Sequence, residues 1–166
     1  ANRSLVGRIS QYHFAPTETA RNNLLKENVN PASIAVTGNT VIDALLEVQT
    51  RLPDYDPRSW APKLPEDTID RIENRPSKFI LITGHRRENF GQGFVDFCSA
   101  LKSIATDQPD WLLVYPVHLN PNVQKPVFEL LSGCTNILLR DPQDYLPFVW
   151  MLDKCDLVIT DSGGIQ

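Results

Sequence analysis

The residues of this sequence that are best suited to chemistry come directly after short apolar runs. The segment His85-Arg86-Arg87 follows one run, and Ser162-Gly163-Gly164 follows another. Arginine guanidinium groups form paired hydrogen bonds with phosphate or carboxylate, and a histidine donates to a phosphate or acts as an acid or base. Glycines let an anion approach the backbone, whose N–H groups bind it together with a serine hydroxyl. The two segments therefore favour a site for an anion.

These residues also have structural interpretations that the sequence leaves open. The Ser-Gly-Gly segment is equally typical of a plain strand–helix turn, and the two arginines with Glu88 form a solvated surface run. His118 either contacts a ligand or fixes its own loop through a hydrogen bond to a backbone carbonyl. Phe148 either stacks on a base or packs in the core, and His13 lies in an apolar segment that favours a core histidine.

Four apolar runs precede the polar segments and predict the strands that position them. The runs alternate little, as expected of parallel strands buried on both faces, and they lie at residues 79–82, 112–115, 137–139 and 157–159. Between them, apolar residues recur at helical spacing near residues 94–104, 123–131 and 146–152. This alternation predicts an α/β fold with a doubly wound parallel sheet and right-handed crossovers.

The carboxyl ends of parallel strands meet at one edge of such a sheet, and ligands bind beyond that edge. The polar segments that follow the predicted strands would share it, and they begin at Thr83, Pro116, Arg140 and Asp161. The sequence therefore predicts a pocket at this edge, to which His85, Arg86 and Ser162 contribute.

The first half of the chain is less regular than the second. It predicts a strand at residues 12–15, a helix at 18–28 capped by Thr17, a strand at 34–37 and a helix at 40–46 with Thr40 and Asp43 as a capping box. Prolines interrupt residues 53–76, which we expect to be a connection or a broken helical excursion. Three parts are therefore expected, namely residues 1–52 as the end of one α/β unit and a crossover, 53–76 as the connection, and 77–166 as an incomplete ligand-binding domain.

Composition excludes several classes of protein. With 16 Lys and Arg against 20 Asp and Glu, the net charge of −4 argues against a general nucleic-acid binder. No apolar run is long enough to span a membrane, and we expect a cytoplasmic location. The cysteines fit neither a metal site nor a disulfide and are expected as small buried residues, namely Cys98, Cys134 and Cys155. Motifs of P-loop ATPases, GxGxxG dehydrogenases, HExxH zinc proteases and GxSxG hydrolases do not occur.

Several motifs occur together in a characteristic order. They are His13-Phe14-Ala15-Pro16-Thr17, Thr37-Gly38-Asn39-Thr40-Val41-Ile42-Asp43, Thr83-Gly84-His85-Arg86-Arg87-Glu88-Asn89, Pro116-Val117-His118-Leu119-Asn120-Pro121 and Thr160-Asp161-Ser162-Gly163-Gly164-Ile165-Gln166. This set resembles the non-hydrolysing bacterial UDP-N-acetylglucosamine 2-epimerases, and the resemblance covers essentially the whole chain.

The resemblance implies a GT-B architecture, in which two Rossmann-like domains enclose the active site. It implies interconversion of UDP-N-acetylglucosamine (UDP-GlcNAc) and UDP-N-acetylmannosamine (UDP-ManNAc), the latter for surface polysaccharides. UDP would be eliminated to leave a 2-acetamidoglucal and then added again. Neither a metal nor another cofactor would be needed, and the partners would be UDP-GlcNAc, UDP and a second subunit of a homodimer.

The resemblance also implies roles for particular residues. His85 would be the active-site histidine near the UDP phosphates. Ser162, Gly163 and Gly164 would hold the diphosphate, and Phe148 would lie against the uracil. In members with allosteric control, Arg86 and His118 match positions that touch a second UDP-GlcNAc.

Family members are much longer than 166 residues, and this chain starts without Met and stops just after a predicted strand. We therefore expect a central part of the family's chain, inactive alone because the acidic residues that would move the C2 proton lie elsewhere. Two alternatives remain at this point. One is a GT-B glycosyltransferase with a UDP-sugar donor, and the other is a non-catalytic module that binds nucleotide sugars.

Overall fold

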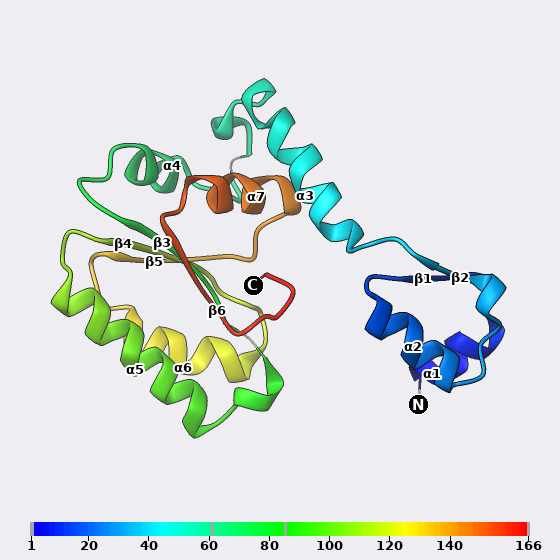
Figure 1. Cartoon of the computed structure of the whole chain (residues 1–166). Coiled ribbons are helices and arrows are strands. Elements are labelled where there is room, and N and C mark those ends of the chain that lie inside the picture. Colours follow the sequence, from blue (N-terminus) through cyan, green and yellow to red (C-terminus); the bar gives the residue numbers. More distant parts are fainter. Residues whose placement is uncertain (1, 61, 85, 166) are drawn as a thin grey trace. The chain divides into compact units, whose positions relative to one another are not determined.

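A computed structural model describes residues 2–60, 62–84 and 86–165 of the chain. Contacts divide the chain into two compact units, Ala1–Thr50 and Arg51–Gln166. Figure 1 traces both units from the N-terminus to the C-terminus. Across the described residues, no helix is both long and apolar enough to cross a membrane.

The first unit is built around a small parallel sheet. Strand β1 (His13–Ala15) pairs with β2 (Ile34–Val36), and three helices accompany them, namely α1 (Asn2–Ile9), α2 (Glu18–Lys26) and α3 (Thr40–Arg51). Thr17 caps α2 as predicted, because its hydroxyl accepts a hydrogen bond from the Ala20 N–H at 3.1 Å. The predicted capping box at Thr40 is wrong, since the side chain of Asn39 instead accepts from the Val41 N–H at 3.2 Å. His13, expected in the core, is half-buried.

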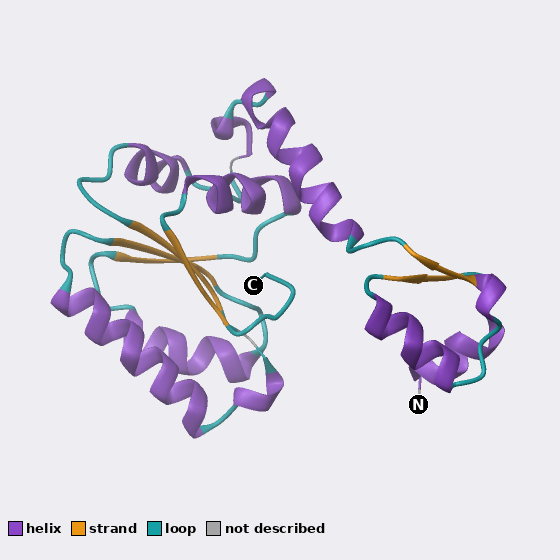
Figure 2. Cartoon of the chain, in the orientation of Figure 1, coloured by secondary structure: helices purple, strands orange, loops and turns teal. Residues whose placement is uncertain are grey.

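The second unit contains a parallel sheet in the order β5-β4-β3-β6. All predicted strands of this half are confirmed, each one residue longer than expected, as β3 (Phe79–Thr83), β4 (Leu112–Pro116), β5 (Ile137–Arg140) and β6 (Leu157–Thr160). Figure 2 shows these strands in orange, layered between helices. The central strand β3 is buried along its whole length, as the lack of alternation predicts.

Helices cover both faces of this sheet (Figures 1 and 2). Helices α5 (Gln92–Asp107) and α6 (Pro121–Leu131) pack together on one face, and α4 (Glu66–Glu73) and α7 (Tyr145–Lys154) lie on the other. The α5–α6 face buries alternate strand residues, among them Ile80, Ile82 and Leu113. Full burial of each such side chain contributes about 1.5–3 kcal/mol to the free energy of folding. The doubly wound α/β fold is thereby confirmed.

The proline-rich residues 53–76 follow a broken helical path. The 3-10 helices η2 (Leu52–Asp54) and η3 (Pro57–Trp60) precede α4. Several side chains here are buried, among them Leu64 and Ile69. The rings of Trp60 and Trp150 meet edge to face at 5.8 Å, which ties the segment to α7.

The cysteines are free thiols. Cys98 is fully buried in the core, as expected, and burial raises the pKa of its thiol to about 11. Cys134 and Cys155 are half-buried rather than fully buried.

Candidate functional site

The order of the strands locates the most favourable ligand position on this sheet. From β3 the chain proceeds through α5 to β4 and through α6 to β5, and then returns through α7 to β6 on the other side of β3. The loop that leaves β3 therefore leads to α5 on one face, whereas β6 is reached from α7 on the other face. This reversal is the topological switch point, where parallel α/β sheets open a crevice for ligands. Of the predicted segments, those that follow β3 and β6 lie on adjacent strands at this point.

A pair of threonines closes the end of the β3–β6 pairing. Thr83 and Thr160 are partners in the register, and the Thr83 hydroxyl donates to the Thr160 hydroxyl at 2.7 Å. The Thr160 hydroxyl also accepts the Ser162 N–H at 2.9 Å. These contacts fix where the Ser-Gly-Gly segment leaves the sheet.

Gly84 leaves β3 in a crowded place. The Tyr115 hydroxyl donates a hydrogen bond to the Gly84 carbonyl. Burial, the largest cause, raises the pKa of Tyr115, so the hydroxyl keeps its proton and remains a donor. A β-carbon on Gly84 would lie 2.8 Å from the ring of Phe97. Glycine is therefore needed here because the backbone passes directly over a packed aromatic ring.

The loop after β3 turns back toward β6. The Asp161 carboxylate accepts hydrogen bonds from the Arg86 N–H at 2.8 Å and from the Asn89 side-chain amide at 3.1 Å. The guanidinium of Arg86 reaches the Ser-Gly-Gly segment, because its Nη2 lies 3.7 Å from the position that a β-carbon would take on Gly163. The same guanidinium pairs with Glu88 at 2.9 Å.

The segment Ser162-Gly163-Gly164 forms a turn rather than a helix in the residues described, with the Ile165 N–H donating to the Ser162 carbonyl at 3.1 Å. Both glycines are exposed and Ser162 is half-buried. A cation thus lies beside the exposed Gly163, and the Ser162 hydroxyl lies beside the exposed Gly164, a combination that suits a phosphate group.

Of the other predicted site residues, His118 and Phe148 lie on other elements of the second unit. His85 lies outside the described residues, although its neighbours Gly84 and Arg86 are described. His118 follows β4 and is exposed, and its Nδ1 accepts the Asn120 N–H at 3.1 Å, so the ring fixes its own loop. Phe148 lies in the middle of α7 and is half-buried.

Arg140 differs from the expectation that it would face the pocket. Its guanidinium donates to the Thr68 hydroxyl and to the Asp67 carboxylate of α4. The arginine is thereby engaged in attaching α4 to the end of β5. Asp141, next in the chain, is exposed.

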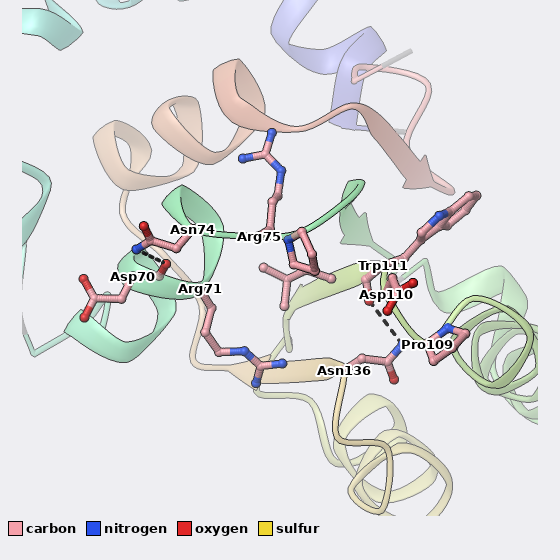
Figure 3. Close-up of a pocket in the computed structure, with 10 residues that line it drawn as sticks. Asp70, Arg71, Asn74, Arg75, Pro109, Asp110, Trp111 and Asn136 are labelled. Atoms are coloured by element: carbon pink, nitrogen blue, oxygen red, sulfur yellow. Dashed lines mark hydrogen bonds between the residues drawn. The ribbon is translucent and has the colours of Figure 1, made fainter.

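The opposite edge of the sheet also has a hollow, with a cavity of about 400 Å³ (Figure 3). Three of the polar side chains that line it donate hydrogen bonds to backbone carbonyls. Arg71 donates to the Thr135 carbonyl at 2.9 Å, Asn74 donates to the Asp70 carbonyl at 2.9 Å, and Asn136 donates to the Trp111 carbonyl at 3.1 Å. The residues described contain no cluster of His, Cys, Asp or Glu that could hold a metal ion at either edge.

Sequence reasoning did not identify two residues that shape the site. Asp161 belongs to the motif at residues 160–166, but the motif alone assigns it no role. Tyr115 belongs to the apolar run at residues 112–115, which predicts only a strand. A signal existed for Asp161, because a carboxylate directly after a strand at the switch point is well placed to accept loop N–H groups.

Comparison with known proteins identifies relatives along the whole chain. The family model described as UDP-N-acetylglucosamine 2-epimerase matches residues 1–166. UDP-N-acetylglucosamine 2-epimerase of Escherichia coli K12 is 52% identical over 168 residues, which cover 100% of this chain and 43% of that protein. The enzyme of the same name from Campylobacter jejuni is 47% identical over 167 residues, again with 43% of its length covered.

Solved structures agree with these sequence relatives. UDP-GlcNAc 2-epimerase from Neisseria meningitidis bound to UDP-GlcNAc superposes with a TM-score of 0.80 at 42% identity, covering 99% of this chain and 43% of that one. The Methanocaldococcus jannaschii enzyme in complex with UDP-GlcNAc and UDP gives a TM-score of 0.71 at 29% identity, covering 99% and 44%. These likenesses confirm the predicted Rossmann-like fold of the GT-B type.

The chain spans 43% of the length of the curated relatives that it matches. Because the family model matches every residue from 1 to 166, the chain belongs to the UDP-N-acetylglucosamine 2-epimerase family.

Proposed function

We propose that this chain forms the UDP-binding side of a UDP-GlcNAc 2-epimerase. The observation that carries the proposal is the placement of the Arg86 guanidinium beside Gly163 at the switch point between β3 and β6. A diphosphate at this point would meet the backbone of Ser162, Gly163 and Gly164 on one side and the cation on the other. Relatives solved with UDP-GlcNAc or UDP support a nucleotide diphosphate as the ligand.

The proposed chemistry breaks the bond between C1 of the sugar and the β-phosphate oxygen. Loss of the C2 proton forms the C1–C2 double bond of 2-acetamidoglucal, and the bonding electrons leave with UDP. Re-addition of UDP with a proton delivered to the other face of C2 gives UDP-ManNAc. Negative charge grows on the leaving phosphate, so Arg86 and the N–H groups of the Ser-Gly-Gly segment would stabilise the transition state more than the substrate.

His85 is proposed to donate to the phosphates or to transfer a proton there, as the family resemblance implies. The carboxylates beside Arg86 have other partners in the structure. Glu88 pairs with the Arg86 guanidinium, and Asp161 accepts from the loop after β3. We therefore assign neither of them to the C2 proton.

Further assignments are proposed on the resemblance. Phe148 would lie against the uracil, and its half-buried ring has a free part for such a contact. Arg86 and His118 would touch a second UDP-GlcNAc in an allosterically controlled enzyme.

Residues 1–52 would close an N-terminal domain, 53–76 would connect it, and 77–166 would bind UDP. A cytoplasmic homodimer without nucleic acid is proposed for the enzyme, and the net charge of −4 supports the last point.

Calorimetric titration of the purified chain with UDP tests the proposal. We expect UDP to bind at least about tenfold more tightly than uridine, because a charge-assisted hydrogen bond contributes about 1.5–3 kcal/mol. Arg86→Ala should weaken UDP binding by about tenfold. Arg87→Ala is the matched control, since this exposed neighbour removes the same charge from the same loop and should change the affinity by less than about twofold.

Equal affinities for UDP and uridine, or equal effects of the two arginine substitutions, would contradict a diphosphate site at Gly163. Incubation of the same preparation with UDP-GlcNAc should give no UDP-ManNAc detectable by NMR, because the chain alone is expected to be inactive. Formation of UDP-ManNAc would contradict that expectation and would exclude a non-catalytic binding module.

A further inference from the structure

One oxygen atom of Asp161 holds both ends of a turn. Its Oδ2 accepts the Arg86 N–H at 2.8 Å and the Asn89 side-chain amide at 3.1 Å. The two donors come from the N-cap and the last residue of the 3-10 helix η4 (Arg87–Asn89), in which the Asn89 N–H donates to the Arg86 carbonyl at 3.1 Å. The first and last residues of the turn are therefore fixed relative to a single atom, and the turn is held as one unit.

Asp161 is itself held firmly by its neighbours in the chain. Thr160, directly before it, is the register partner of Thr83 and is bonded to it through their hydroxyls at 2.7 Å. Ser162, directly after it, donates its N–H to the Thr160 hydroxyl at 2.9 Å. The carboxylate therefore projects from a fixed backbone, and whatever it binds inherits that position.

The turn that Asp161 holds carries the cation of the candidate site. Arg86 has an exposed side chain, and its pairing with exposed Glu88 is screened by solvent and is too weak to fix the guanidinium by itself. The backbone of Arg86, by contrast, receives a charge-assisted hydrogen bond. The backbone from which the guanidinium extends toward Gly163 is thus anchored by the carboxylate.

We propose that Asp161 is a positioning residue for the diphosphate site, fastening the loop after β3 to the Ser-Gly-Gly turn after β6. The inference rests on the proposed function, because the site it organises is the one assigned to UDP. It extends that function by assigning a task to a carboxylate that the proposed function leaves without a role in binding or proton transfer. Without this contact, Arg86 would sample positions away from Gly163, and UDP binding would have to order it first.

The chain offers a matched control at the other end of the same strand. Asp156, directly before β6, accepts the Phe79 N–H of β3 at 2.8 Å, the same bond length as between Asp161 and Arg86. Asp156→Ala therefore removes the same kind of contact between β3 and β6, but at the edge away from the site.

The test compares Asp161→Ala, Asp161→Asn and Asp156→Ala. Three readouts are taken for each, namely the UDP dissociation constant, the hydrogen exchange rate of the Arg86 amide by NMR, and Tm. Asp161→Ala should weaken UDP binding by about tenfold and speed Arg86 exchange by about tenfold or more, since two hydrogen bonds are lost. Asp161→Asn keeps an acceptor oxygen without the charge, so its effects should be about threefold.

Asp156→Ala should lower Tm while it leaves UDP affinity and Arg86 exchange within about twofold of the wild type. The proposal is overturned if Asp161→Ala lowers Tm but leaves Arg86 exchange and UDP affinity unchanged, or if Asp156→Ala changes them equally. Amide exchange needs no ligand, so wild-type protein that fails to bind UDP would contradict the proposed function alone. Should Asp161→Ala not fold, Asp161→Asn with the exchange measurement still decides the question.

Discussion

At each of the two edges of the second unit's sheet, an aspartate carboxylate accepts a backbone N–H, but the charged side chains next to the two carboxylates differ. At the amino edge Asp156 accepts the Phe79 N–H, and Lys78 and Arg75 lie 3.1 and 3.6 Å from its carboxylate. At the carboxyl edge Asp161 accepts the Arg86 N–H, while the Arg86 guanidinium lies beside Gly163 instead. Two cations therefore lie beside the aspartate at the amino edge, whereas at the carboxyl edge the guanidinium of Arg86 pairs with Glu88 and reaches the exposed Gly163.

This difference separates stability from binding. The polar side chains around the amino-edge cavity bond to backbone carbonyls, as Arg71 and Asn136 do (Figure 3). These hydrogen bonds to backbone carbonyls contribute to the stability of the fold. At the carboxyl edge the backbone of Gly163 and Gly164 is exposed. Substitutions at the amino edge should therefore change Tm, and substitutions at the carboxyl edge should also change UDP affinity.

The largest effect on stability is expected for Gly84→Ala. The added methyl group would lie 2.8 Å from the ring of Phe97, and that ring is packed against Phe94 and Tyr115. Overpacking of this kind lowers the free energy of unfolding by about 1–3 kcal/mol, which urea denaturation measures. UDP affinity should fall as well, because the displaced backbone leads into the loop that carries Arg86.

Gly93→Ala is the control for this substitution. Gly93 lies in the first turn of α5, and nothing is within 4 Å of the position that its β-carbon would take. Alanine there should leave the free energy of unfolding unchanged or raise it by up to about 1 kcal/mol. A similar loss at both glycines would mean that close approach to Phe97 is not what requires glycine at position 84.

A smaller effect is expected for Tyr115→Phe, which keeps the ring and removes the hydroxyl. The Gly84 carbonyl, which is buried, would lose its donor, and the free energy of unfolding should fall by about 1 kcal/mol. Urea denaturation measures this change, and titration with UDP measures the accompanying loss of affinity. Tyr145→Phe serves as the control, because Tyr145 is half exposed at the start of α7 and its hydroxyl should contribute less than about 0.5 kcal/mol. Equal effects from the two tyrosines would contradict a structural role for the Tyr115 hydroxyl.

The strands and their order of appearance could be predicted because each is a short apolar run buried on both faces. Ile80, Leu81 and Ile82 lie on β3 with almost no exposure, and only such residues tolerate that position. The edge on which the polar segments meet followed from parallel pairing alone. What the sequence did not reveal is that β6 lies beside β3, since spatial order depends on contacts between distant segments.

The role of Asp161 could not be predicted for this reason, because its hydrogen bond to Arg86 crosses 75 residues of chain. Arg140 illustrates the converse error. Its position directly after a strand predicts that it faces the pocket, but its guanidinium donates hydrogen bonds to Asp67 and Thr68 instead. Both partners belong to helix α4. Prolines on either side of this short helix predict a connection rather than a helix, so the sequence did not indicate α4.

The smallest effect is expected when the Tm of Asp156→Asn is compared with that of the wild type as the pH falls. This comparison tests the amino edge alone. The hydrogen bond from the Phe79 N–H, followed by that from Lys78, lowers the pKa of the Asp156 carboxyl below its usual value. A carboxyl whose pKa is lower in the folded than in the unfolded state stabilises the fold above its unfolded pKa of about 3.9. That contribution is lost as the pH falls through the folded-state pKa.

The Tm difference between wild type and Asp156→Asn should therefore be largest near neutral pH and shrink below about pH 4, as measured by thermal denaturation across pH. Asp110→Asn, an exposed substitution at the same edge, should give a smaller difference throughout. UDP affinity at pH 7 should be unchanged in both variants. A Tm difference for Asp156→Asn that stays constant down to pH 3 would show that the contact acts through its shape rather than its charge. The carboxylates of Asp156 and Asp161 would then act alike, as hydrogen-bond acceptors, and the two edges would differ only in the residues next to these carboxylates.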